Sequence, residues 1–487
     1  MIIKYFICSL NQNNITLALL KTISGIRGTI GGKYGSNLTP QDIIECTAAF
    51  GTWVLKNKKG SKAKIIIGRD ARISGAMVSG LVVNTLISLG IDVVDLGLST
   101  TPTVEIAVPE EGADAGIILT ASHNPKEWNA LKLLNSEGEF ISAEDGAAFL
   151  AFIDSGEIVY ADVDMLGQYS EDDSYIQKHI DKIFDLQVVD KELVASKKFR
   201  VVVDPVNSTG TISIVPLLEQ MGCEIFLING DVTGNFAHNP EPLPENLHQL
   251  SREVGSKKAH LGISVDPDVD RLAFVCEDGE MFGEEYTLVA VADYILQNTP
   301  GNTVSNLSST RALRDVTEKH GHTYEAAAVG EVNVVTKMKE IGAIIGGEGN
   351  GGVIYPTLHY GRDALVGVAI MLTALAKFGK PLSFLRRKYP DYTISKKKLD
   401  LPEGVNVDTL LNQLEDKYKP MKDCTRSRID GLKIEFTDGN WIHMRKSNTE
   451  PIIRVYAEST SPVIADNLIQ KINRDIYEIL SQPVEDN

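Results

Sequence analysis

One local pattern, repeated three times, constrains the fold of this chain more than any other feature. It consists of an apolar run, a polar turn, a helical stretch, a glycine and a second apolar run, and it occurs at residues 65–97, 200–228 and 302–329. The glycines that end the three helical stretches are Gly90, Gly222 and Gly321. Because a glycine between a helix and a strand is typical of a left-handed helix cap, each segment predicts a β-α-β crossover. The copies begin more than a hundred residues apart, which indicates repeated domains and not a solenoid with a period of roughly 20–50 residues.

The last hundred residues or so follow a different pattern. Short runs at 396–401, 433–436 and 441–444 predict strands, and the Asp-Gly-Asn sequence at 438–440 predicts a hairpin turn between two of them. A helix is predicted over 462–480. This part of the chain therefore predicts a smaller α+β domain with an antiparallel sheet.

The chain of 487 residues is too long for a single hydrophobic core. We predict an α/β fold of four domains, in which three repeated α/β domains precede the smaller C-terminal domain. The predicted domains are 17–160, 161–258, 259–382 and 383–487. The predicted linkers, which are rich in polar residues or in Gly and Pro, lie around 155–175, 250–260 and 378–392.

Composition excludes several classes of function. The net charge of -17 and the pI near 5.1 argue against a nucleic-acid partner, whose phosphates need a basic surface. No run approaches the roughly 18 apolar residues of a membrane-spanning helix, so no membrane association is expected. The five cysteines are odd in number and lack a C-x-x-C pair, which argues against a disulfide framework or a zinc site and fits the cytoplasm. Residues 1–16 are interpreted as a dispensable extension.

The sequence TASHNP at 120–125 follows the apolar run 115–119, which predicts a buried strand. Ser122 is therefore expected at the carboxyl end of a strand, where open α/β sheets bind their ligands. A serine needs a neighbouring base or a positive field to become a nucleophile, and His123 and Lys132 are the nearest candidates. The alternative is an ordinary polar turn.

Three carboxylates, Asp266, Asp268 and Asp270, follow the apolar run 261–265. In an extended segment this spacing directs all three to one side, where their repulsion calls for a cation such as Mg²⁺. The alternative is an exposed acidic turn. Arg271, next to the trio, either contacts a phosphoryl oxygen or relieves the repulsion between the carboxylates.

Three further segments carry groups suited to a phosphorylated sugar. The glycine-rich loop 346–352 offers Glu348 and Asn350 to hydroxyls or an amine, although a plain flexible loop would look the same. The loop RKSNTEP at 445–451, followed by Arg454, gathers cations and hydroxyls suited to phosphate. Arg27 lies between glycines near the start of the chain. Asp363, which precedes the apolar run 364–375, is interpreted as a helix N-cap and not as a catalyst.

The four motifs TASHNP, DPDVDR, GEGNGG and RKSNTEP occur in one order, and with them the chain resembles the α-D-phosphohexomutases from about Thr22 to its C-terminus. This family contains phosphoglucomutases, phosphomannomutases and phosphoglucosamine mutases. The resemblance implies that the three α/β domains have mixed sheets and that all four domains surround a central active-site cleft. It assigns the phosphoserine loop, the metal loop, the sugar-binding loop and the phosphate-binding loop to successive domains, with the metal loop at the end of the second.

The resemblance also implies roles for individual residues. Ser122 would carry the transferred phosphoryl group and, with Asp266, Asp268 and Asp270, bind Mg²⁺. Arg27 and Arg271 would lie near the transferring group, and His123 and Lys132 would act as general acid or base. Glu348 and Asn350 would bind the sugar hydroxyls. The residues expected to hold the non-reacting phosphate are Arg445, Ser447, Asn448, Thr449 and Arg454.

The implied reaction interconverts a hexose or hexosamine 6-phosphate and its 1-phosphate through a hexose 1,6-bisphosphate. Glu331 stands where relatives specific for glucose or mannose often have histidine, and an acidic residue suits the ammonium of glucosamine 6-phosphate. The sequence therefore looks closest to the phosphoglucosamine mutases. The alternatives are a mutase of broad specificity, a Ser/Mg²⁺-dependent sugar phosphatase and a non-catalytic sensor. The expected partner is a small sugar phosphate, bound by a monomer or homodimer.

Overall fold

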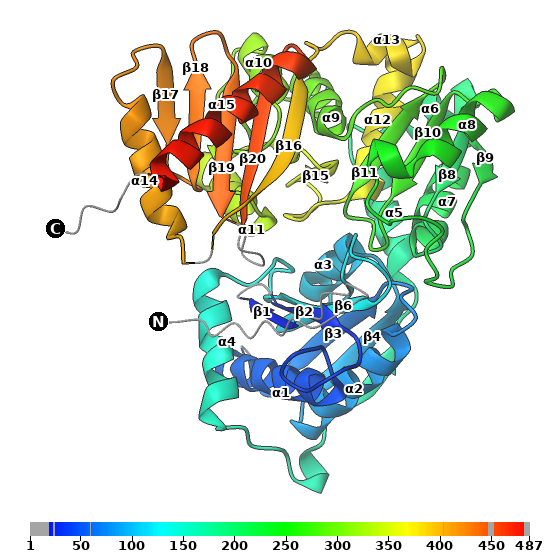
Figure 1. The fold of residues 1–487 in the computed structure, drawn as a ribbon. Helices are drawn as coiled ribbons and strands as arrows, with labels where there is room; N and C mark the ends of the chain where they lie inside the picture. The colour runs from blue at the N-terminus through cyan, green and yellow to red at the C-terminus, as the bar shows by residue number, and fades with distance from the viewer. Residues whose placement is uncertain (1–18, 23–24, 59, 403, 447–451, 482–487) are drawn as a thin grey trace.

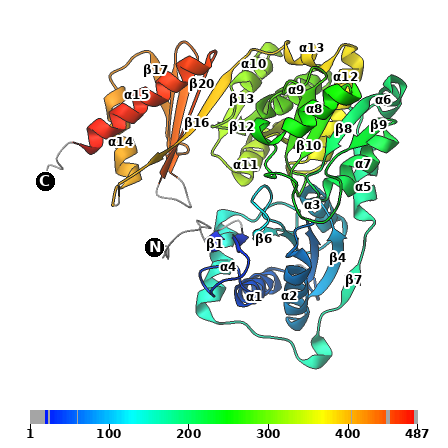
Figure 2. The same cartoon turned by 45° about the vertical axis from the view of Figure 1, so that its right-hand side comes forward.

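The computed structural model describes residues 19–22, 25–58, 60–402, 404–446 and 452–481. These residues form four sheets, each with its own helices (Figure 1). The first sheet lies apart at the bottom of the view, and the other three lie side by side above it. The same arrangement is visible after a rotation of 45° (Figure 2), which also shows that the chain crosses from the first sheet to the second along one side.

The first domain contains a seven-stranded mixed sheet in the order β1-β2-β6-β5-β3-β4-β7. Strands β5, β3, β4 and β7 run parallel to one another. Strands β1, β2 and β6 are each antiparallel to their neighbours in the sheet. The strands are β1 (Leu19–Thr22), β2 (Gly25–Thr29), β3 (Lys64–Arg69), β4 (Asp92–Leu98), β5 (Ala115–Leu119), β6 (Trp128–Leu134) and β7 (Tyr169–Glu171). The helices are α1 (Pro40–Asn57), α2 (Gly75–Ser88), α3 (Thr101–Glu110) and α4 (Ala143–Ser155).

The second domain contains a four-stranded sheet in the order β11-β10-β8-β9. Its strands are β8 (Arg200–Asp204), β9 (Glu224–Leu227), β10 (Leu261–Val265) and β11 (Leu272–Cys276). Its helices are α5 (Tyr175–Phe184), α6 (Lys191–Lys197), α7 (Gly210–Gln220) and α8 (His248–Lys257). Only β11 is antiparallel to its neighbour, so the sheet is mixed.

The third domain repeats this arrangement with the order β13-β12-β14-β15, in which β15 is the antiparallel strand. Its strands are β12 (Thr303–Asn306), β13 (Tyr324–Ala327), β14 (Ile345–Glu348) and β15 (Gly352–Ile354). Its helices are α9 (Glu284–Asn298), α10 (Ala312–Lys319), α11 (Glu331–Ile341) and α12 (Ala364–Phe378), and the short helix α13 (Leu382–Arg386) follows.

The fourth domain contains a five-stranded antiparallel sheet in the order β16-β20-β19-β18-β17. Its strands are β16 (Thr393–Asp400), β17 (Cys424–Ser427), β18 (Leu432–Phe436), β19 (Trp441–Lys446) and β20 (Ile452–Ser459). Helices α14 (Val407–Tyr418) and α15 (Pro462–Leu480) pack on one face of the sheet and enclose a core of Leu, Ile and Val side chains.

The predicted fold class is confirmed. The three repeats are β3-α2-β4, β8-α7-β9 and β12-α10-β13, and in each the two strands are parallel neighbours. The three predicted capping glycines all adopt positive φ, at +81° for Gly90, +72° for Gly222 and +78° for Gly321. The antiparallel C-terminal sheet and the helix at 462–480 also form as predicted.

One of the predicted domain boundaries is wrong. The break at 258/259 would cut the second sheet, because β10 pairs with β8 and β11 pairs with β10, so both strands belong to the domain that precedes them. Helix α8 occupies the linker predicted around 250–260. Strand β7 lies beyond the predicted break at 160/161 and pairs with β4, so the segment that connects the first two domains adds an edge strand to the first sheet. Short elements of this kind join a sheet through long-range pairing, which local composition does not encode.

Helix α12 joins the second and third domains into one unit. Thirteen of its fifteen residues are buried, and the helix is apolar on all sides. Its side chains belong to one continuous core that runs from Ile180 in the second domain to Tyr389 beyond the third. The first and fourth domains have cores of their own. The loop between β10 and β11 is fixed against this helix, because the Ala364 N–H donates to the Val269 carbonyl oxygen at 3.2 Å.

No helix within the described ranges is long and apolar enough to span a membrane.

Gly25 is a position where the fold requires glycine. It pairs with Lys132 across β2 and β6 and adopts φ +138°, and a Cβ placed there would overlap the carbonyl oxygen of Leu131. We expect Gly25→Ala to lower the unfolding free energy of the first domain by about 3 kcal/mol, because strain and overpacking add. Chemical denaturation followed by circular dichroism measures this change.

The matched control is Gly112→Ala in the same domain. Gly112 also has a positive φ, at +56°, but a Cβ there would meet no atom within 4 Å. The control removes the same backbone freedom without the overlap, so it should cost only about 1 kcal/mol. Equal losses for the two variants would contradict the role assigned to the β2–β6 contact.

Candidate active site

Ser122 lies where the sequence predicts it, immediately beyond the carboxyl end of β5 and almost fully buried. Its backbone adopts φ +49°, in the left-handed region that costs energy for any residue except glycine. The hydroxyl Oγ donates to Asp266 Oδ2 at 2.7 Å and lies 3.3 Å from His123 Nδ1. The strained loop therefore directs the hydroxyl of the first domain at a carboxylate of the second.

The Ser122 loop is held by Arg72, a residue that the sequence reasoning missed. The buried Arg72 guanidinium donates to the carbonyl oxygens of four loop residues, and its Nε pairs with Asp70 Oδ2 at 2.9 Å. The four acceptors are Ser122, Asn124, Pro125 and Trp128. Asp70 also accepts from the Thr120 hydroxyl at 2.6 Å. The available signal was an Asp-x-Arg pair directly after an apolar run, at the carboxyl end of β3, the strand beside β5.

Asp266, Asp268 and Asp270 are all buried and converge, with one ligand atom of each lying within 4.8 Å of the others. Asp266 Oδ1 accepts from the backbone N–H groups of Asp270 and Arg271, both at 3.1 Å. Burial, and then the two neighbouring carboxylates, raises the pKa of Asp266 well above its ordinary value. The protein groups around this trio thus leave negative charge uncompensated.

The carboxylate trio fits a divalent cation with oxygen ligands. Asp268 Oδ1 and Asp270 Oδ1 are buried and make no hydrogen bond within the described part of the chain, so two ligand atoms are free to bind an ion. The Ser122 hydroxyl lies against Asp266 and adds a fourth oxygen. An all-oxygen set with room for water or phosphate oxygens suits Mg²⁺.

Lys132 reaches the trio from β6. Its ammonium lies 2.6 Å from Asp268 Oδ2 and 3.3 Å from Asp270 Oδ2. Burial alone would lower the pKa of Lys132, but these two carboxylates raise it above its ordinary value. An ammonium held in this way donates hydrogen bonds and positive charge, which favours a role as acid or counter-ion over one as base.

His123 lies beside the Ser122 hydroxyl and faces cationic neighbours. Burial, followed by the charges of Arg271 and Arg27, lowers the pKa of His123 well below its ordinary value. The imidazole is therefore neutral near pH 7 and able to accept a proton. Arg271 Nη1 donates to Glu241 Oε1 at 2.9 Å, and Arg27 Nη1 donates to Asn124 Oδ1 at 2.8 Å. Both predicted arginines thus lie within the network around the Ser122 loop and the carboxylate trio.

Arg362 connects the predicted sugar-binding residues to the metal loop, and the sequence reasoning did not predict this role. Its guanidinium donates to Asp270 Oδ2 at 2.8 Å, to Glu348 Oε2 at 2.9 Å and to Glu331 Oε2 at 3.0 Å. The Arg362 backbone N–H binds Glu331 Oε1 at 2.9 Å. Both oxygens of Glu331 are therefore paired with a cationic residue. This pairing differs from the free carboxylate expected to receive an ammonium group.

Glu348 and Asn350 lie together at the end of β14. Glu348 Oε1 accepts from Asn306 Nδ2 at 2.8 Å and from the Gly330 N–H at 3.1 Å, so the carboxylate is fixed by residues from two other loops. Asn350 uses Oδ1 to accept from the Gly352 N–H at 3.1 Å. The loop is thus ordered by its own hydrogen bonds, unlike a plain flexible loop.

The predicted phosphate-binding residues are only partly within the described structure. Arg445 at the end of β19 and Arg454 on β20 are direct partners across the two strands, so their cationic side chains start from adjacent positions. Ser447, Asn448 and Thr449 lie outside the described residues. In Figure 1 the ends of β19 and β20 that carry this loop point toward the first domain, the domain that contains Ser122.

Asp363 is confirmed as the N-cap of α12, because its Oδ1 accepts from the N–H groups of Leu365 at 2.8 Å and Val366 at 3.2 Å. Its other oxygen lies 2.9 Å from His179 Nε2 and 3.3 Å from His359 Nε2. On the far side of His359, Nδ1 lies 3.4 Å from the buried carboxyl of Glu105. Burial, and then Glu331, raises the pKa of Glu105 well above its ordinary value.

The geometry joins the Ser122 hydroxyl, a neutral imidazole, three carboxylates suited to a cation and four cationic side chains within one network. The four are Lys132, Arg362, Arg271 and Arg27. Thr101 binds this network to the first domain, because its N–H and hydroxyl donate to Asp268 at 2.9 and 2.7 Å. Phosphoryl transfer needs mainly positioning and stabilisation of negative charge, and these groups offer both.

Comparisons with known proteins agree with this arrangement. Models of the phosphoglucomutase/phosphomannomutase family match all four domains, with alpha/beta/alpha domains I, II and III at residues 19–157, 173–279 and 283–392 and the C-terminal domain at 399–474. A solved structure of a phosphoglucomutase/phosphomannomutase family protein from Burkholderia thailandensis has a TM-score of 0.80 and 26% identity, over 93% of this chain and 95% of that one.

Two archaeal relatives match across nearly the whole chain. A probable phosphoglucosamine mutase from Methanopyrus kandleri is 32% identical over 94% of this chain and 98% of its own length. A phosphoglucomutase/phosphomannomutase from Thermococcus kodakarensis is 34% identical over 89% of this chain and 94% of its own length. The chain therefore belongs to the phosphoglucomutase/phosphomannomutase family, the phosphohexomutases that the four sequence motifs indicated.

Proposed function

We propose that this phosphohexomutase interconverts a hexosamine or hexose 6-phosphate and the corresponding 1-phosphate, with glucosamine 6-phosphate as the favoured substrate. The reaction uses a phosphoserine at Ser122 and a hexose 1,6-bisphosphate that turns around in the cleft. The observation that carries this proposal is the Ser122 hydroxyl hydrogen-bonded to the buried carboxylate trio. A serine in that position is suited to carrying a phosphoryl group beside a divalent cation.

The transfer exchanges one P–O bond for another. A sugar hydroxyl attacks the phosphorus of phosphoserine, the bond to Ser122 Oγ breaks, and the proton of the attacking hydroxyl passes to a base. Neutral His123, 3.3 Å from Ser122 Oγ, is suited to accept that proton. After the bisphosphate has turned, its other phosphoryl group returns to Ser122, and the proton goes back to the oxygen that leaves the phosphorus.

The residues that would hold Mg²⁺ are Asp266, Asp268 and Asp270, with an oxygen of the Ser122 side chain. A bound Mg²⁺ supplies positive charge to the transferring phosphoryl group. Lys132 and Arg271 add fixed positive charge from the protein, because both lie against the carboxylate loop. Arg27 orients the Ser122 loop through Asn124.

The opposite end of the substrate is assigned to the third and fourth domains. We propose that Glu348 and Asn350 bind sugar hydroxyls. Arg445, Ser447, Asn448, Thr449 and Arg454 would hold the phosphate that is not reacting. Because one anchor would serve both orientations of the bisphosphate, the same site could accept the 1-phosphate and the 6-phosphate end in turn.

We base the proposed preference for glucosamine 6-phosphate on the names of similar proteins and not on Glu331. Two of the similar proteins are a probable phosphoglucosamine mutase and, at 30% identity from Sulfurisphaera tokodaii, a phosphoglucosamine/phosphogalactosamine mutase. Broad specificity is the second candidate, because Glu331 is already paired with Arg362 and its carboxylate is less available to an ammonium group.

We expect Ser122→Ala to abolish mutase turnover while the sugar phosphate still binds, because only the hydroxyl that carries the phosphoryl group is lost. Turnover is measured with glucosamine 1-phosphate and binding by isothermal titration calorimetry. Incubation with glucose 1,6-bisphosphate followed by intact mass measurement should add one phosphoryl group to the wild type and none to the variant.

Three results would contradict this assignment. More than a few per cent of wild-type activity in Ser122→Ala would exclude Ser122 as the carrier. A failure of the wild type to gain mass would favour a non-catalytic sensor. Steady release of inorganic phosphate at or above the rate of isomerisation would favour the phosphatase alternative.

We expect Asp268→Asn to weaken Mg²⁺ binding by at least tenfold, because the amide keeps the size of the side chain but removes one of the three charges around the ion. Calorimetric titration with Mg²⁺ measures this without reference to turnover. Asp162→Asn is the matched control, because Asp162 is exposed and lies outside the trio. An unchanged Mg²⁺ affinity in Asp268→Asn would remove Asp268 from the site.

Substrate preference is tested by initial rates on glucosamine, glucose and mannose 1-phosphates under one set of conditions. The proposal expects kcat/KM for glucosamine 1-phosphate to exceed the other two by about tenfold or more. Glu331→Gln should reduce all three rates by a similar factor, because the carboxylate positions Arg362. Equal wild-type rates on the three sugars would instead establish broad specificity.

A further inference from the structure

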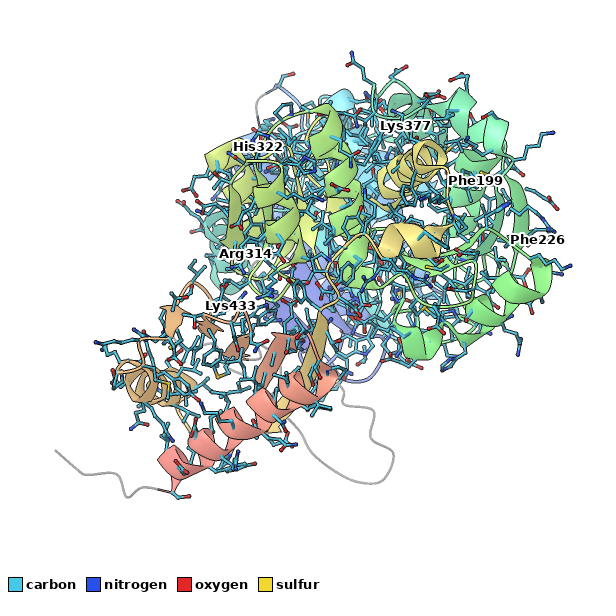
Figure 3. The ribbon with its side chains drawn as sticks, turned by 90° about the horizontal axis from the view of Figure 1, so that it is seen from above. Phe199, Phe226, Arg314, His322, Lys377 and Lys433 are labelled. Carbon is cyan, nitrogen blue, oxygen red and sulfur yellow. The ribbon has the colours of Figure 1, made fainter. Side chains whose placement is uncertain are left out.

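A small crevice between the third and fourth domains has no role in the proposed reaction. Its volume is about 110 Å³, and none of the residues assigned to the metal, the phosphoserine, the sugar or the phosphate lines it. The lining comes from the segment after β12, from α10 and β13 on one side and from β17, β18 and β19 on the other. Figure 3 shows two of the lining residues, Arg314 and Lys433, at the junction of these two domains.

The charged side chains that line the crevice are mainly cationic. Arg311, Arg314 and Lys433 contribute three positive charges, and Glu435 contributes one negative charge. Arg314 pairs with Glu435, which leaves Arg311 and Lys433 without an ion-pair partner among the lining residues. Because the whole chain has a net charge of -17, a local excess of positive charge in one crevice is unusual and suggests an anionic ligand.

Lys433 is held in the crevice without a direct ion pair. Its ammonium donates to the Leu307 carbonyl oxygen at 2.8 Å and lies 4.2 Å from the centre of the Trp441 ring, and it forms no ion pair with any described residue. Burial lowers the pKa of Lys433 to about 8, although the charges of Glu435 and Glu458 act in the opposite direction. The direct contacts of this buried cation are therefore a carbonyl and an aromatic face, and the two carboxylates act on it from a distance.

Arg311 also forms no ion pair with any residue that the structure describes. It stacks on Tyr392 at 4.2 Å, and its buried Nε makes no hydrogen bond among the residues that the structure covers. The guanidinium of Arg426 is held away from Lys433, because its Nη1 donates to the Tyr418 carbonyl oxygen at 3.1 Å on the face of the sheet that α14 covers. The hydroxyl groups of Thr425 and Ser427 complete the polar lining.

We propose that this crevice binds a phosphate group, either inorganic phosphate or the head group of a small phosphomonoester. Arginine and lysine with hydroxyl donors are the groups that bind phosphate oxygens in proteins. The crevice, with a volume of about 110 Å³, has room for a phosphate group. The site is thus separate from the substrate site, because none of the proposed substrate-binding residues lines it.

A phosphate in the crevice connects the fourth domain to the sugar-binding loop. Ser309 lies in the lining, and its hydroxyl accepts from the Gly349 N–H at 2.9 Å. On the other side, β18 leads directly through a short turn into β19, which carries Arg445 near its end. Anion binding therefore stabilises one position of the phosphate-binding loop relative to Glu348.

Trp441 provides a local reporter, because it lines the crevice and is one of only three tryptophans in the chain. In a background with Trp53→Phe and Trp128→Phe, titration with inorganic phosphate should change the Trp441 fluorescence with a saturable midpoint. Glycerol 3-phosphate is titrated in parallel, and the lower midpoint identifies which of the two phosphate sources the crevice prefers. Sodium chloride at equal ionic strength should give no saturable change.

Lys433→Met and Arg311→Gln should each raise the phosphate midpoint by at least tenfold. Arg428→Gln is the matched control, because Arg428 contacts Asn412 and Glu415 outside the crevice. Arg445→Gln, which removes an arginine of the proposed substrate site, should leave the Trp441 midpoint unchanged. The two cationic variants act independently, so a folding defect in one leaves the other as a test.

The proposal is overturned if the Trp441 signal shows no saturation, if sodium chloride reproduces it, or if Arg311→Gln and Lys433→Met both keep the wild-type midpoint. It is also overturned if Arg445→Gln alone abolishes the signal, because the signal would then report phosphate in the substrate site. None of these outcomes depends on mutase activity, so the test is separate from that of the proposed function.

Discussion

Burial of three carboxylates at one end of β10 is the constraint on which the rest of the site depends. Like charges in a low-dielectric interior repel strongly, so cations must be brought to them from elsewhere in the chain. Lys132 comes from the first domain and Arg362 from the third, and both reach Asp270. The electrostatic need of one loop thus fixes how three domains meet, and a bound Mg²⁺ would supply the charge that these two side chains leave uncompensated.

Much of the fold could be predicted because its signals are local. Apolar runs, polar turns and capping glycines each depend on a few neighbouring residues, and the strands at Ala115–Leu119 and Leu261–Val265 form where those runs predict them. The end of the second domain could not be predicted, because two helices and a strand, α7, β9 and α8, separate β10 and β11 from β8. Only the hydrogen bonds between distant strands show which sheet they join.

The same distinction applies to the site. Ser122 and the three aspartates lie on short loops at strand ends, so the motif alone brings them to the right place. Arg72 acts on a loop fifty residues away, and its role is defined by the carbonyl oxygens that it contacts. Glu331 illustrates the same difference between sequence and structure. In a sequence, an acidic residue suggests a free negative charge, whereas in the structure Arg362 binds both carboxylate oxygens of Glu331.

The distribution of the cores indicates where the molecule can move. The second and third domains share one apolar core through α12, so separating them would expose buried hydrophobic surface. The fourth domain meets the third mainly through polar contacts, among them Arg314 with Glu435 and Ser308 with His443. Polar contacts can be exchanged for water at small cost, and the cationic crevice lies at this junction. A bisphosphate that must turn around needs a cleft that opens and closes, and this junction is where the fold allows that motion at the lowest cost in buried apolar surface.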